Sequence, residues 1–155
     1  MTMNRIWMTL FLAATAWLTV NFGSAPAHAQ DLIELRVTVQ YDGSGPVNEQ
    51  HGIHLFFFDS PDFASGDPNV IPIAMRTVYS NGQTVVLAGL RQETVYLVAA
   101  YNEDGSYDTP MGPPPSGTPV AIYRADDPAA PTPIALKGEP TVAIDFTFDD
   151  SDRMP

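Results

Sequence analysis

The sequence predicts an all-β protein, a sandwich of seven or eight antiparallel strands, and two observations support this prediction. First, short runs rich in β-branched and aromatic residues recur along the chain, and clusters of Gly, Pro, Asn and Asp separate them. Second, no stretch after the first 29 residues combines helical periodicity with helix caps. Short strands at this spacing are typical of two sheets packed face to face.

The first 29 residues have the features of a cleaved secretory signal peptide. A basic residue, Arg5, precedes an apolar run at 6–20, and a small-residue triplet follows at 27–29. A helix that spans a membrane needs about 20 apolar residues, and this run is shorter. We therefore expect cleavage after the triplet, a single domain at 30–155, and no membrane span in the mature chain.

The net charge and the lack of cysteine exclude some classes of function. The formal net charge is −11 at pH 7, and Arg5 is the one basic residue that lies in the predicted signal. An acidic surface repels phosphate groups, so we expect no nucleic acid partner. The chain has no cysteine, which excludes disulfides and cysteine nucleophiles. We expect a periplasmic or secreted protein.

The first half of the domain contains three strand candidates. Residues 34–40 alternate apolar and polar side chains, as a half-buried strand does, and breakers at 42–46 end the run. Residues 53–58 are apolar on nearly both faces, which indicates a central strand. The run 70–79 contains Pro72, which cannot donate to a ladder and indicates an edge strand or a bulge.

The pair Asn81-Gly82 predicts a tight hairpin turn. Both residue types accept the positive φ that a two-residue hairpin loop needs. The strand at 84–87 is therefore expected to pair back on the preceding strand.

Four more strand candidates complete the chain. Residues 94–101 are rich in β-branched and aromatic side chains, and two short candidates follow at 120–123 and 132–136. The last, 141–148, places four apolar side chains on one face: Val142, Ile144, Phe146 and Phe148.

Two segments carry a family resemblance. Residues 81–90 (NGQTVVLAGL) and 95–102 (VYLVAAYN) resemble the core of the carboxypeptidase regulatory-like domains, which have a prealbumin-like (transthyretin-like), Ig-like sandwich. The resemblance covers loosely 31–148, although Glu93 and Thr94 stand where the family has a glycine. It implies a non-catalytic binding or structural module whose partner, a protein or a carbohydrate, is unknown.

The stretch NEDGSYD is the clearest candidate for a metal site. Oxygen-bearing side chains alternate along it: Asn102, Asp104, Ser106 and Asp108. Calcium takes six to eight oxygen ligands, so this loop is a candidate Ca²⁺ site, although Pro113 replaces the glutamate that an EF-hand would need. The alternative is a solvated turn at Asp104-Gly105. Apart from Ca²⁺ we expect no cofactor.

The acidic, proline-rich region 102–123 is the expected working surface. Three tyrosines flank it and are candidates for contacting a ligand or partner: Tyr101, Tyr107 and Tyr123. Ordinary packing is the alternative for these rings. The run 110–119 (PMGPPPSGTP) reads either as a polyproline II ligand or, more simply, as a stiff loop.

The other polar residues do not indicate catalysis. His51 and His54 lie three apart and are expected on opposite faces at a partly exposed strand end, without a third metal ligand nearby in sequence. Met75, Met111 and Met154 do not cluster with them. No G-x-S-x-G motif marks a nucleophile. We expect an exported non-enzymatic β-sandwich module, and a small-ligand or carbohydrate-binding periplasmic protein is the alternative.

Overall fold

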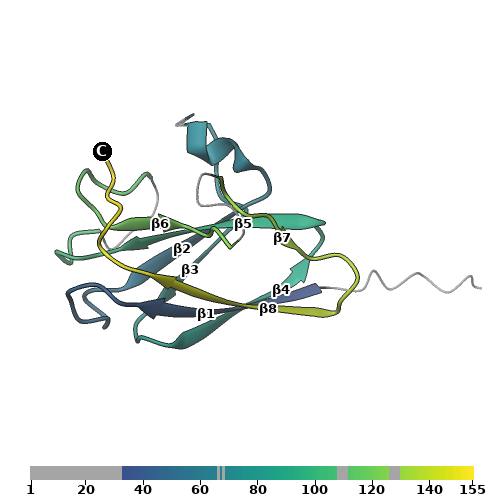
Figure 1. The fold of residues 1–155 in the computed structure, drawn as a ribbon, viewed down its shortest axis with the longest axis horizontal. Helices are drawn as coiled ribbons and strands as arrows, with labels where there is room; N and C mark the ends of the chain where they lie inside the picture. Colours follow the sequence, from purple (N-terminus) through teal and green to yellow (C-terminus); the bar gives the residue numbers. More distant parts are fainter. Residues whose placement is uncertain (1–32, 66, 68, 108–111, 126–129) are drawn as a thin grey trace, which may run out of the picture.

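The computed structural model describes residues 33–65, 67, 69–107, 112–125 and 130–155. Two sheets of three and five strands pack face to face, so the predicted β-sandwich is confirmed (Figure 1). The predicted signal peptide lies outside the described residues. In the part of the chain described, no helix has the length and apolar character needed to cross a membrane.

The three-stranded sheet has the order β4-β1-β8. Strand β1 (Ile33–Tyr41) pairs antiparallel with β4 (Gln83–Leu90) and parallel with β8 (Thr141–Phe148). The parallel pair departs from a purely antiparallel sandwich. Parallel neighbours need a long connection that returns the chain to the same end of the sheet. Here the rest of the domain, which lies between β1 and β8 in sequence, provides that connection.

The five-stranded sheet has the order β3-β2-β5-β6, and β7 also pairs with β5. Its strands are β2 (Ile53–Phe58), β3 (Ala74–Val78), β5 (Thr94–Tyr101), β6 (Val120–Ile122) and β7 (Ile134–Ala135). The connection from β2 to β3 contains a 3₁₀ helix, η1 (Pro61–Ser65), on the outer side of this sheet (Figure 1). Strand β3 begins after Pro72, as expected for an edge strand.

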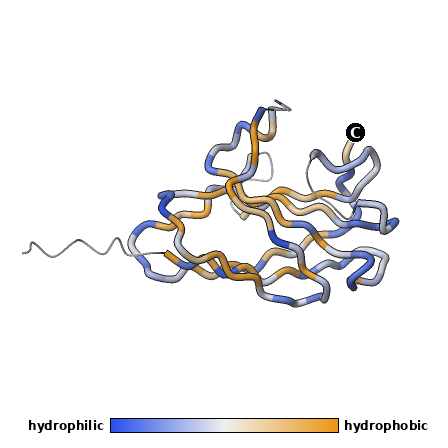
Figure 2. The backbone as a smooth tube through the Cα atoms, turned by 180° about the vertical axis from the view of Figure 1, so that it is seen from behind, coloured by the Kyte–Doolittle hydropathy of each residue, from blue (hydrophilic) through white to orange (hydrophobic). Residues whose placement is uncertain are grey.

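The main core lies between the two sheets. Alternate residues of β1, β2 and β5 point inward, which explains the period-2 pattern of the sequence, and Figure 2 shows hydrophobic residues along the strands of both sheets. Each large side chain buried here contributes about 1.5–3 kcal/mol to stability. The fully buried members include Leu35, Val37, Val39, Ile53, Leu55, Phe57, Val95, Leu97 and Tyr101.

A second apolar cluster lies on the outer face of the five-stranded sheet. Phe56 and Phe58 of β2 pack there with Ala100 and Tyr107, and the Phe63 ring of η1 stacks on Phe58 at 4.7 Å between centroids. This cluster explains why 53–58 is apolar on both faces. The three-stranded sheet presents a polar outer face instead, for example the Thr38 and Thr84 hydroxyls 2.9 Å apart.

The predicted hairpin at Asn81-Gly82 is wrong, because β3 and β4 belong to different sheets. The turn carries the chain from one sheet to the other. Gly82 has a φ of 74° and donates from its N–H to Val39 O at 2.8 Å. The Asn81 amide exchanges two hydrogen bonds with the Tyr41 backbone, of 2.6 and 2.7 Å, and so replaces a strand neighbour at the end of β1.

Candidate functional site

The candidate metal residues lie in the loop after β5, where their side chains make hydrogen bonds within the chain. Asn102 is 4% exposed; its Oδ1 accepts from Tyr107 N at 2.9 Å, and its Nδ2 donates to Gln50 O at 3.3 Å. The Asn102 amide therefore stabilises the folded-back conformation of the loop after β5. Asp108 lies outside the described residues, so the four-residue calcium site stays a prediction.

Asp104 and Ser106 form a local turn on the surface. The Asp104 Oδ1 accepts from Ser106 N at 2.9 Å and from Ser106 Oγ at 2.7 Å. These hydrogen bonds, chiefly the one from the Ser106 N–H, hold the pKa of Asp104 below its ordinary value. Gly105 follows with a φ of 73°, a conformation that glycine adopts at low cost.

The three tyrosines occupy different environments. Tyr101 is fully buried, and its hydroxyl donates to Pro46 O at 3.0 Å. Tyr107 is 7% exposed, and burial raises its pKa to about 12. Tyr123 is half-buried and packs edge-on against Phe146. In this structure the three rings do not form a common exposed platform, and their ligand-binding role stays a prediction.

The two histidines also hold the loop after β5. His54 lies within β2 and is buried, rather than partly exposed at a strand end, because the loop covers it. Its Nε2 lies 2.7 Å from Tyr107 O, and since a carbonyl only accepts, this nitrogen donates. Its Nδ1 lies 2.9 Å from Thr77 Oγ1. His51 donates from Nδ1 to Glu103 O at 3.0 Å.

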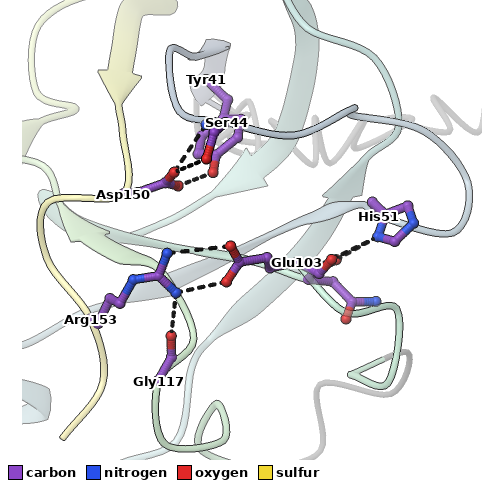
Figure 3. A network of polar contacts seen from close by, with 8 residues as sticks. Tyr41, Ser44, His51, Glu103, Gly117, Asp150 and Arg153 are labelled. Carbon is purple, nitrogen blue, oxygen red and sulfur yellow. Dashed lines mark hydrogen bonds and ion pairs between the residues drawn. The ribbon is translucent and has the colours of Figure 1, made fainter.

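A polar network closes one end of the sandwich (Figure 3). The Tyr41 hydroxyl donates to Asp150 Oδ1, and Ser44 donates to Oδ2 from its N–H at 2.9 Å and from its hydroxyl at 2.8 Å. Burial and then the carboxylate raise the pKa of Tyr41, while the Tyr41 hydroxyl lowers that of Asp150. A side chain at position 43 would collide with Tyr41 and Asp150, which explains why Gly43 is a glycine.

Residues 149–155, called here the closing segment, continue this network. The Arg153 Nη1 donates to Glu103 Oε2 at 2.6 Å and to Gly117 O at 2.8 Å, and Nη2 donates to Glu103 Oε1 at 3.3 Å (Figure 3). The Glu103 carboxylate raises the pKa of Arg153. The sequence carried no signal for this contact, because the partners are separated by 50 residues and no local pattern joins them.

A shallow depression of about 280 Å³ lies beside the closing segment. Its acidic lining includes Asp42, Asp149 and Asp152. Within the described ranges, however, no three His, Cys, Asp or Glu side chains are placed to share one metal ion. Among the described residues, the depression therefore has too few grouped ligands for a cation site.

Exposed apolar side chains lie directly before and after the edge strand β3. In the described part of the chain four large hydrophobic side chains are exposed, and three of them belong here: Ile71 (75% exposed), Ile73 (36%) and Tyr79 (48%). Met75, half-buried, lies between them in sequence and packs against the outer cluster of the five-stranded sheet. The fourth, Val86, lies alone on β4. We define the apolar strip as Ile71, Ile73, Met75 and Tyr79.

The comparisons with known proteins provide one structural match. No protein-family model matches the chain, and no curated protein matches it. The chain is similar in fold to an alternative pilotin from the type II secretion system of Vibrio cholerae, with 12% sequence identity and a TM-score of 0.46. The match covers 76% of this chain and 96% of that one. At this level the similarity concerns only the general fold.

Proposed function

We propose that this chain is an exported, non-catalytic β-sandwich module that binds a protein partner through the apolar strip. The single observation that carries the proposal is that exposed apolar side chains lie in the residues directly before and after one edge strand, β3. Scattered surface hydrophobics are normal, but a grouped apolar surface is typical of a protein-binding site. Ile71, at 75% exposed, is the side chain that a partner would bury most.

The strip binds by its side chains rather than by adding a strand to β3. Strand β3 has only five residues, and Pro72 precedes it. The Arg76 guanidinium donates to Met75 O at 2.7 Å and so satisfies a main-chain acceptor of this strand. Short length, proline and a charged side chain are the means by which edge strands avoid strand addition.

Further support comes from the sequence. The predicted signal peptide supports a periplasmic or secreted module. The resemblance to the carboxypeptidase regulatory-like, prealbumin-like domains supports a binding role without catalysis. A carbohydrate-binding role has less support, because Tyr101 and Tyr107 are buried. The proposal includes no cofactor.

Site-specific crosslinking tests the proposal. A photoreactive benzoylphenylalanine replaces Ile71 or Ile73 in the full chain, made in the cells that naturally produce it. Position 86 is the matched control, because Val86 is exposed but lies on the other sheet. We expect one discrete protein adduct from positions 71 and 73 and none from position 86.

A second substitution makes the test specific. Tyr79→Ser removes the far end of the strip and leaves positions 71 and 73 unchanged. We expect it to reduce the adduct at position 71, because the partner loses part of its apolar contact. Adducts that form equally from position 86, or no adduct from any position, would contradict the proposal.

A further inference from the structure

The closing segment lies along the edge of the five-stranded sheet beside β6. Its residues pair antiparallel with the chain just before and within β6, through the bridge between Pro119 and Arg153. Three main-chain hydrogen bonds of 2.9 Å join the two: Gly117 N to Met154 O, Met154 N to Thr118 O, and Val120 N to Asp152 O. Residues 117–120 are called here the acceptor edge because they receive the closing segment, and their main-chain groups are thus paired with residues of the same chain.

One side chain adds specificity to this pairing. The Arg153 guanidinium reaches both oxygens of the Glu103 carboxylate and also the Gly117 carbonyl. A planar guanidinium matches a carboxylate with two parallel hydrogen bonds, which a lysine ammonium does not reproduce. The edge at 117–120 is thus paired through main-chain groups, which do not depend on side-chain identity, and through one arginine side chain.

No side chain of residues 151–155, the outer part of the closing segment, belongs to either apolar cluster. Ser151, Asp152 and Arg153 are exposed, and Met154 is half-buried. Asp150 remains held by Tyr41 and Ser44, so the end of β8 stays anchored when the residues after it move. Three main-chain hydrogen bonds, the Arg153 contacts and an ion pair of 3.6 Å between Asp152 and Arg124 hold residues 151–155 in place.

Main-chain pairing along a sheet edge, combined with one side-chain anchor, is a general mode of peptide recognition. The charge of the chain, −11, also favours a cationic anchor. We propose that the acceptor edge and Glu103 form a binding site for an extended, arginine-bearing segment of a partner protein. In this structure residues 152–154 occupy that site in cis. The site is separate from the apolar strip, so either proposal can fail alone.

A released variant of the full chain tests this inference. Arg153→Gln removes the anchor, and Met154→Pro removes the N–H that bonds to Thr118 O, so the closing segment no longer holds the edge. The probe is a synthetic peptide with the sequence of residues 149–155. Binding is followed through the backbone amide signals of Gly117, Thr118 and Val120 in nuclear magnetic resonance spectra.

We expect saturable binding of the peptide to the released variant, with shifts at these three amides. The parent chain should bind the peptide at least about tenfold more weakly, because its own segment competes at a high effective concentration. Adding Glu103→Gln to the released variant should weaken binding by about tenfold, the effect of losing a charged hydrogen-bonded partner.

The controls separate recognition from folding. Circular dichroism shows whether the released variant is folded, and if it is not, the single variant Arg153→Gln takes its place in the titration. A peptide in which glutamine replaces the arginine should bind about as weakly as the intact peptide binds the Glu103→Gln protein. Absence of saturable binding, or binding that is indifferent to Glu103, would overturn the inference.

Discussion

At the scale of single residues, Asp150 has a structural role that the sequence did not indicate. It accepts hydrogen bonds from a buried phenol, Tyr41, and from the loop residue Ser44. The carboxylate therefore connects the end of β1, the β1–β2 connection and the chain after β8. Asn81 has a comparable role on the other side of Tyr41, where it completes the backbone hydrogen bonds of β1.

Asp150 should contribute to stability in a pH-dependent way. Its folded pKa is lowered, so the stabilisation is present above the unfolded pKa, about 4, and is lost as the pH falls through the lower folded pKa. We expect Asp150→Asn to lower the free energy of unfolding at pH 7 by about 1 kcal/mol, since the amide still accepts but carries no charge.

Urea unfolding between pH 2 and pH 7 checks this prediction. The difference between the parent and Asp150→Asn should shrink as the pH falls below 4. Asp145→Asn is the matched control, because Asp145 is an exposed carboxylate on the outer face of β8. A difference that stays constant across this pH range would contradict the assigned role.

At the scale of elements, the loop after β5 is held by hydrogen bonds from its own side chains. Asn102 accepts a hydrogen bond from the Tyr107 N–H, and His54 of β2 donates one to the Tyr107 carbonyl. The outer face of β2 is therefore covered by a segment whose polar groups are paired. This arrangement explains why a sequence that resembles a calcium loop is ordered here by amide and imidazole groups.

We expect calcium to leave the stability of this loop unchanged. Thermal melts of residues 30–155 in EDTA and in millimolar calcium should coincide, because the Asn102 amide already makes hydrogen bonds to Tyr107 and Gln50. Asp104→Ala should lower the melting temperature by the same amount in both buffers, since it removes the turn at Ser106. A calcium-dependent rise that Asp104→Ala abolishes would support the metal site instead.

At the scale of the whole molecule, the two sheets meet along a continuous core and are joined at one end by polar contacts. Figure 3 shows these contacts between the β1–β2 connection, the loop after β5 and the closing segment. Along the side, Tyr123, just after β6, packs edge-on against Phe146 of β8, with ring centroids 5.8 Å apart and planes at 82°. This ring pair links one sheet to the other.

A double-mutant cycle measures that link. We expect Tyr123→Leu and Phe146→Leu to show a coupling energy of about 0.5–1.5 kcal/mol in urea unfolding, the range for edge-to-face aromatic pairs. A control cycle combines Tyr123→Leu with Thr38→Ala, on the outer face of the three-stranded sheet, and should be additive within about 0.5 kcal/mol. Equal coupling in both cycles would contradict a specific contact between the sheets.

Much of the architecture was predictable from local patterns. Alternating apolar residues located β1 and β8, since side-chain direction along a strand depends only on its period of two. The β-branched and aromatic composition of 94–101 located β5, and the two-faced run of β2 indicated its central position. The same alternation places Tyr101 on the face of Val95 and Leu97. The burial of Tyr101 therefore agrees with ordinary packing, the alternative to a ligand-contacting role for this ring.

By itself the sequence determined where strands form, which faces are apolar, and that the chain is acidic and free of cysteine, because these properties depend on neighbouring residues and composition. Only the tertiary structure decided that Asn81-Gly82 connects two sheets, that β1 and β8 run parallel, and that Arg153 meets Glu103. Those outcomes depend on pairings between distant residues, in which a strand edge or a carboxylate accepts one of several competing partners. The same competition underlies the proposed acceptor edge, which residues 152–154 fill in this structure.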